Sequence, residues 1–157
     1  MAINNIVNTP TSSSGWTSFI STITASTPPT IGAGSSITSY YLQIGKILYV
    51  TFAFTNAGTG TNGVGTYLVN IPSGFTMNSS IVSFSNPEST LGTCRISNQV
   101  AGPDYAIGVV LAQSATQYRI VVNSSSSGAE NYWSSTFFNF VTANNFCVSA
   151  MMRIPIT

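Results

Sequence analysis

Few side chains in this chain are equipped for acid–base chemistry. The carboxylates are Glu88, Asp104 and Glu130, the only lysine is Lys46, and there is no histidine. A Ser-His-Asp or Cys-His site is therefore excluded, while a glycosidase would need two of the carboxylates across a cleft and a Ser-Lys dyad would need Lys46. All three acids fall in or beside turn-rich segments, and Lys46 occupies an expected hairpin turn. We therefore expect solvated turn residues, no catalytic residue and no enzymatic activity.

Metal and cofactor sites are not expected either. Cys94 and Cys147 are far apart, and neither a CxxC motif nor a histidine accompanies them. They could form a disulfide, but synthesis in a cytoplasm favours free, buried thiols. Residues 58–63 match the GxGxxG pattern of dinucleotide sites, which requires a helix directly afterwards. Residues 64–69 instead have the composition of a strand, so the pattern indicates a loop between strands.

The most suggestive binding cluster is the segment from Glu130 to Ser135. Its aromatic rings are flanked by an amide, a carboxylate and hydroxyls, so it could stack on a sugar and hydrogen-bond its hydroxyl groups. We expect a possible glycan contact at Asn131, Tyr132 and Trp133. The alternative is that Trp133 begins a core strand and packs inward.

Composition excludes several classes of partner. Only 4% of the 157 residues are charged and the net charge is +1, whereas a soluble domain usually has about a quarter of its residues charged. So little charge cannot steer nucleic acid. No stretch reaches the ~18 apolar residues of a membrane span, and the N-terminus lacks the basic and apolar regions of a signal peptide. We expect no nucleic acid, no membrane insertion and synthesis in a cytoplasm without export by that route.

Strand-forming patterns determine the expected architecture. Residues 1–15 are a polar, flexible N-terminal arm, and residues 16–157 form one domain. The clearest hairpin joins 39–44 to 47–55 through Gly45-Lys46, where glycine at the first turn position suits a two-residue turn. Further strands are expected at 16–24, 65–71, 80–85, 90–97, 105–112, 117–122, 132–141 and 146–154. About ten short strands with regular turns predict an all-β sandwich or barrel.

Period-2 alternation also selects a core. The expected core residues are apolar and share one face of their strands: Leu48, Val50, Phe52, Phe54, Leu68, Ile107, Val109, Ile120, Val122 and Phe138.

Two segments carry a resemblance to a known class of protein. Residues 32–50 read GAGSSITSYYLQIGKILYV, and residues 70–75 read NIPSGF. This arrangement resembles modules of phage tail fibres and other viral surface proteins, over roughly residues 16–75. The resemblance implies a jelly-roll-like antiparallel β-sandwich head that assembles as a homotrimer and binds a host or partner surface. The binding loops of such heads vary, so no site residue is transferred to this chain.

These observations lead to one expected function and two alternatives. We expect a viral structural protein, a trimeric fibre, spike or decoration domain at the virion surface, whose partners are a host-surface glycan or another virion protein. The alternatives are a lectin-like carbohydrate-binding module outside a virion and a small polysaccharide-degrading enzyme that uses two of the three carboxylates.

Overall fold

The protein is all-β in the part of the chain that its structure describes. This computed structural model describes residues 15–85, 88–98, 105–123, 130–134 and 146–157, and all the regular secondary structure within these ranges is strand. The all-β prediction is therefore confirmed. Residues 1–14 of the expected arm and the expected core position Phe138 lie outside the described residues.

Ten strands make up the fold, and most lie where the sequence predicts them. In chain order they are β1 (Thr17–Ser18), β2 (Ile23–Thr24), β3 (Ser36–Ile44), β4 (Ile47–Thr55), β5 (Leu68–Asn70), β6 (Thr90–Asn98), β7 (Tyr105–Ser114), β8 (Gln117–Asn123), β9 (Glu130–Tyr132) and β10 (Phe146–Pro155). The strand expected at 80–85 is not formed, because residues 79–81 form a turn. The Asn78 carbonyl accepts hydrogen bonds from the amides of Ile81 and Val82, at 3.0 and 2.9 Å, which tightens this turn. The strand expected at 16–24 is instead the two short strands β1 and β2, and the strand expected at 132–141 lies mostly outside the described residues.

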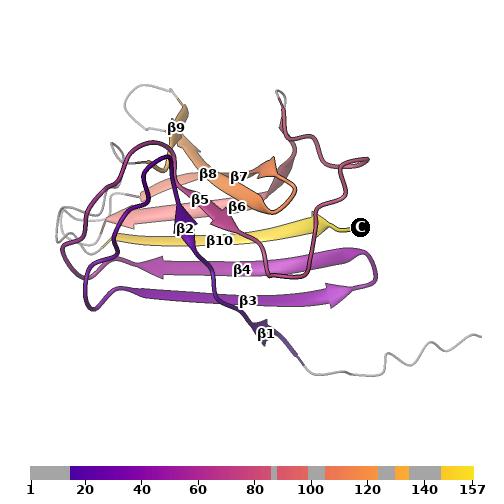
Figure 1. Ribbon diagram of the computed structural model, residues 1–157, viewed down its shortest axis with the longest axis horizontal. Coiled ribbons are helices and arrows are strands. Elements are labelled where there is room, and N and C mark those ends of the chain that lie inside the picture. The colour runs from indigo at the N-terminus through magenta and orange to yellow at the C-terminus, as the bar shows by residue number, and fades with distance from the viewer. Residues whose placement is uncertain (1–14, 86–87, 99–104, 124–129, 135–145) are drawn as a thin grey trace, which may run out of the picture.

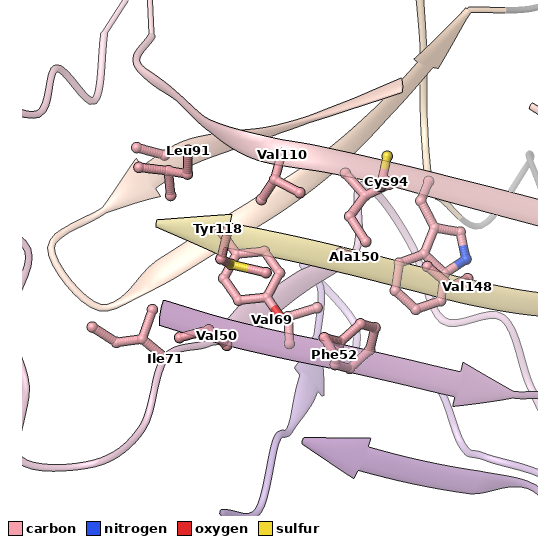
Figure 2. Close-up of a cluster of buried hydrophobic side chains, with 14 of the residues drawn as sticks. Val50, Phe52, Val69, Ile71, Leu91, Cys94, Val110, Tyr118, Val148 and Ala150 are labelled. Carbon is pink, nitrogen blue, oxygen red and sulfur yellow. The ribbon is translucent and has the colours of Figure 1, made fainter. Parts of the chain in front are cut away.

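The strands form one continuous antiparallel sheet in the order β1-β3-β4-β10-β6-β7-β8-β5-β2, and β9 pairs with the other end of β8 (Figure 1). The sheet curls, so that strands distant in this order face each other. Phe52 on β4 and Tyr118 on β8 show this directly, since their ring centroids are 6.3 Å apart although β10, β6 and β7 lie between the two strands in the sheet. The enclosed space is the hydrophobic core (Figure 2).

The β3–β4 hairpin follows the expected local chemistry. Gly45 has φ of 58°, a conformation that glycine adopts without strain, and the two-residue turn brings Ile44 opposite Ile47. Along β4 the even-numbered apolar residues point into the core and are almost completely buried. Six of the predicted core residues, four on β4 and two on β8, are buried and therefore confirmed: Leu48, Val50, Phe52, Phe54, Ile120 and Val122.

Three other core predictions are wrong. Leu68 and Val109 are only half-buried, and Ile107 is 62% exposed. In β7 it is Val110 and Ala112 that point inward. Both faces of β5 and β7 carry apolar residues, so alternation alone does not say which face is buried.

Candidate functional site

The carboxylate that the structure describes belongs to an electrostatic cluster. A carboxylate oxygen of Glu88 lies 2.5 Å from a guanidinium nitrogen of Arg119, and both side chains are mostly buried. The Arg119 guanidinium also lies over the Tyr132 ring, 4.6 Å from its centroid, in a cation–π contact. This cluster connects Glu88, in the segment before β6, to Arg119 of β8 and Tyr132 of β9. Asp104 and the side chain of Glu130 lie outside the described residues, and no group of possible metal ligands occurs within the described ones.

Trp133 is part of the core, which corrects its expected role in a glycan contact. Its side chain is 0% exposed, and its ring packs edge-on against Tyr67 with centroids 5.3 Å apart. The rings of Phe52 and Phe54 lie within 6.3 and 5.8 Å. Backbone hydrogen bonds to Ile120 and Tyr67 fix this position. A ring enclosed in this way cannot stack on a sugar, so the inward-packing alternative describes Trp133.

Asn131 and Tyr132 remain at the surface of the same segment. Tyr132 is 36% exposed, and Asn131 is half-buried. Strand alternation places Tyr132 on the face opposite to Trp133, where Arg119 covers part of its ring. What remains of the expected glycan contact is thus an amide and a ring already stacked on a guanidinium.

The GxGxxG segment is a loop between strands, as predicted, and isolated β-bridges join this part of the chain to the loop before β3. Thr30 and Thr61 exchange backbone hydrogen bonds of 3.0 and 3.1 Å, so the loop before β3 lies against the loop after β4. A Cβ atom on Gly60 would overlap the carbonyl oxygen of Thr30, and one on Gly63 would overlap that of Thr27. These glycines therefore allow two backbones to approach closely, and no helix follows them.

The two cysteines are free thiols, as favoured by the sequence. Cys94 is buried, and its sulfur lies 3.6 Å from the carbonyl oxygen of Val109. Burial raises the pKa of the Cys94 thiol to about 11, opposed by a weaker backbone hydrogen bond from Gly108. This thiol is thus poorly suited to nucleophilic chemistry near neutral pH. Cys147 is only half-buried, which corrects the expectation that both thiols are buried.

The first candidate surface is the outer face of β3, β4, β10, β6 and β7, the face turned away from the core. Facing residues across these strands form rows, such as Tyr40, Thr51, Met151 and Thr93. A hollow of about 550 Å³ lies on this face, with mostly small or hydroxyl-bearing side chains around it. Tyr40, Ile107 and Met151 are 40%, 62% and 65% exposed. We call this region the outer face.

The second candidate is a hollow of about 560 Å³ at one end of the sheet, which we call the turn hollow. Lys46 of the β3–β4 turn and Arg153 of β10 both line it, together with Asn78, Ser89 and Thr90. The sequence places these residues far apart and offers no signal that joins them. Only the antiparallel pairing of β10 with β4, which sets Pro155 opposite Ile47, brings the two cations together.

Comparison of the chain with protein-family models, with curated proteins and with solved structures finds no match. Among the described residues, none belongs to a helix long and apolar enough to cross a membrane. The function must therefore be inferred from the sequence and from the geometry of these surfaces.

Proposed function

We propose that this chain is a viral structural protein, a fibre, spike or decoration domain that assembles as a homotrimer and mediates attachment at the virion surface. The observation that supports this proposal most is the outer face. It exposes large apolar side chains beside small hydroxyl-bearing ones over five neighbouring strands. Exposed apolar surfaces of this kind are typical of protein–protein contacts.

A second copy of the same chain is the occupant that fits this face best. Tyrosine, methionine and arginine are enriched at protein interfaces, and Tyr40, Met151 and Arg95 all lie around the hollow. Arg95 is the only charged residue among the described ones that line it. Identical faces gathered around a threefold axis can therefore approach one another with little like-charge repulsion, which suits a protein with a net charge of only +1.

The finer points of the proposal come from the resemblance to viral fibre heads. It favours three copies over two, the virion surface as location, and a host-surface glycan or another virion protein as partner. It also favours a jelly-roll-like β-sandwich as the description of the fold. The contact between Phe52 and Tyr118 supports two facing layers, one around β4 and one around β8.

Light scattering of the purified full chain tests the assembly. We expect three times the 16.5 kDa mass of one chain, unchanged on dilution to micromolar concentration. Met151→Glu places a charge in the middle of the outer face and should give monomers. Ile20→Glu is the matched control, because Ile20 is 86% exposed and lies outside this face, so its trimer should persist.

Two results would count against this proposal. A wild-type monomer at micromolar concentration would contradict the assembly and favour the lectin-like module outside a virion. A Met151→Glu variant that remains trimeric would show that another surface forms the contact.

A further inference from the structure

The turn hollow combines features that suit a small polar ligand. The β3–β4 turn, the end of β10, the segment at 78–82 and the start of β6 surround it. The β3–β4 turn and the C-terminal end of β10 lie at the same end of the sheet (Figure 1). A volume of about 560 Å³ is within the range of about 300–1,000 Å³ typical of ligand pockets.

Backbone hydrogen bonds hold these walls together. The amide of Ile156 donates to the Lys46 carbonyl at 3.0 Å, and the amide of Asn78 donates to the Pro155 carbonyl at 2.9 Å. The turn, the end of β10 and the segment at 78 are thus joined to one another directly. The backbone of the site therefore loses little conformational entropy when a ligand binds.

Two of the four cationic residues of the chain line this hollow. Lys46 and Arg153 are both exposed, and neither side chain has a partner among the described residues. Within the described part of the chain, no carboxylate side chain lines the hollow. Arg119, in contrast, is neutralised by Glu88. The turn hollow is therefore a local concentration of positive charge on a nearly neutral protein, and it favours an anionic ligand.

Hydrogen-bond donors beside the cations favour a ligand that carries several oxygen atoms. The Asn78 side-chain oxygen accepts from the Ser80 amide at 3.0 Å, so its NH₂ group is left to donate. The Ser89 oxygen accepts from the Ser83 amide at 2.9 Å, which leaves its O–H to donate. The hydroxyl of Thr90 has no partner among the described residues and is exposed. Three neutral donors thus accompany the two charges.

The remaining wall is apolar. Ile81 is 66% exposed, and Val82, Leu91 and Ile156 lie beneath or beside it. Among the residues that the structure describes, no aromatic ring lines the hollow, so this lining offers nothing on which a nucleobase could stack. A sugar ring, with its C–H face and its many hydroxyl oxygens, matches an aliphatic wall and several donors.

We propose that the turn hollow binds an acidic saccharide, with the carboxylate of the sugar on Arg153 and Lys46 and its hydroxyls on Asn78, Ser89 and Thr90. The planar guanidinium of Arg153 suits a carboxylate, which it can engage through two parallel hydrogen bonds. This inference rests on the proposed attachment function and names the class of ligand that the function would use.

Titration calorimetry with soluble sugars tests the site. The probes are trigalacturonate and 3′-sialyllactose, with lactose as the neutral comparison. We expect the wild-type chain to bind at least one acidic probe and to bind lactose at least about tenfold more weakly, since a charge-assisted contact is lost. Affinity for the acidic probe should fall as salt is raised, because exposed charges are screened.

Arg153→Gln and Lys46→Gln should each weaken binding of the acidic probe by about tenfold or more. Arg153→Lys keeps the charge but not the planar fork, so it should recover only part of the loss. Thr59→Glu is the matched control. It lowers the net charge by the same one unit, on an exposed loop beyond the other end of β4, and should leave the affinity unchanged.

The outcomes separate this inference from the proposed function. A trimer that binds neither acidic probe overturns the inference and leaves the proposed assembly standing. A monomer that binds an acidic probe through Arg153 supports the inference and contradicts the proposed assembly. If Thr59→Glu lowers the affinity as much as Arg153→Gln does, net charge alone attracts the probe and the proposed site is overturned. Competition by inorganic phosphate, at equal ionic strength and as strong as the sugar itself, would reduce the hollow to a general anion site and also overturn it.

Discussion

Replacing Tyr118 with phenylalanine should stabilise this protein. Tyr118 is 0% exposed, and its hydroxyl has no hydrogen-bond partner among the described residues. Its ring points into the core between β8 and β4, beside Val69 and Phe52 (Figure 2). Burial raises the pKa of Tyr118 well above the usual value of a phenol, which reflects how poorly this environment replaces water.

The expected gain follows from two opposing terms. A buried polar group without a partner costs about 1–3 kcal/mol, which Tyr118→Phe would recover. The lost oxygen leaves a void no larger than about 15 Å³, the space of one water probe. At about 24 cal/mol per Å³ that void costs roughly 0.4 kcal/mol. The ring keeps its edge contact with Phe52 at 6.3 Å. We therefore expect the free energy of unfolding to rise by about 0.6–2.6 kcal/mol.

Tyr67→Phe is the matched control, because the same atom is removed from an equally buried ring. Tyr67 is also 0% exposed, but its hydroxyl donates a hydrogen bond to the Asn62 carbonyl at 2.9 Å. Losing that bond should lower the free energy of unfolding by about 0.5–1.5 kcal/mol. One chemical change thus has opposite signs at two positions.

Urea denaturation at a single protein concentration measures both effects, since assembly would make stability depend on concentration. The midpoint should move up for Tyr118→Phe and down for Tyr67→Phe, with the slope unchanged. If Tyr118→Phe loses as much stability as Tyr67→Phe, its hydroxyl is satisfied in solution and this reasoning is refuted.

Two further perturbations test the close approach of two loops at Gly60 and the burial of the two thiols. Gly60→Ala should cost about 1–3 kcal/mol in urea, because the added Cβ overlaps the carbonyl of Thr30, whereas Gly15→Ala, with nothing within 4 Å, should cost almost nothing. A thiol reagent at pH 8 should modify half-buried Cys147 well before buried Cys94, and equal rates would contradict that burial. The folded pKa of Cys94 is about 11 against a usual 9.0, so its contribution to stability is complete below pH 9 and lost as the pH rises toward 11. The fall in stability over that window should be shallower in Cys94→Ala.

Local chemistry could be predicted from the sequence. The β3–β4 hairpin follows from glycine at a two-residue turn and from alternation in β4, both properties of neighbouring residues. The loop interpretation of residues 58–63 followed equally locally, from the strand-like residues after it. What the sequence did not contain is the close approach of a second loop, which explains why Gly60 and Gly63 are glycines.

Long-range pairing could not be predicted, and the prediction for Trp133 failed for that reason. The polar neighbours of Trp133 in the sequence suggest a sugar contact, but its ring is enclosed by residues from β4 and from the segment at Tyr67. The sequence around Lys46 predicts an ordinary turn residue, because nothing near it in sequence supplies a second cation. The partner cation, Arg153, is brought to the same hollow by the pairing of β10 with β4.

The geometry of β10 would connect the proposed assembly with the proposed ligand binding. Ser149, Met151 and Arg153 alternate along the exposed side of this strand, so the outer face leads into the turn hollow. Met151 and Arg153 are two residues apart, which is about 7 Å along a strand. A trimer built on the outer face would then carry three turn hollows near the rim of its interfaces. Because linked sites gain avidity of about 10²–10⁴-fold, Met151→Glu should weaken binding to a surface coated with acidic sugar far more than it weakens binding of a soluble probe, which its new charge about 7 Å from Arg153 lowers only through screened repulsion. Arg153→Gln should weaken binding to both the coated surface and the soluble probe. If Met151→Glu abolishes binding of the soluble probe as well, the outer face and the turn hollow are not separate surfaces.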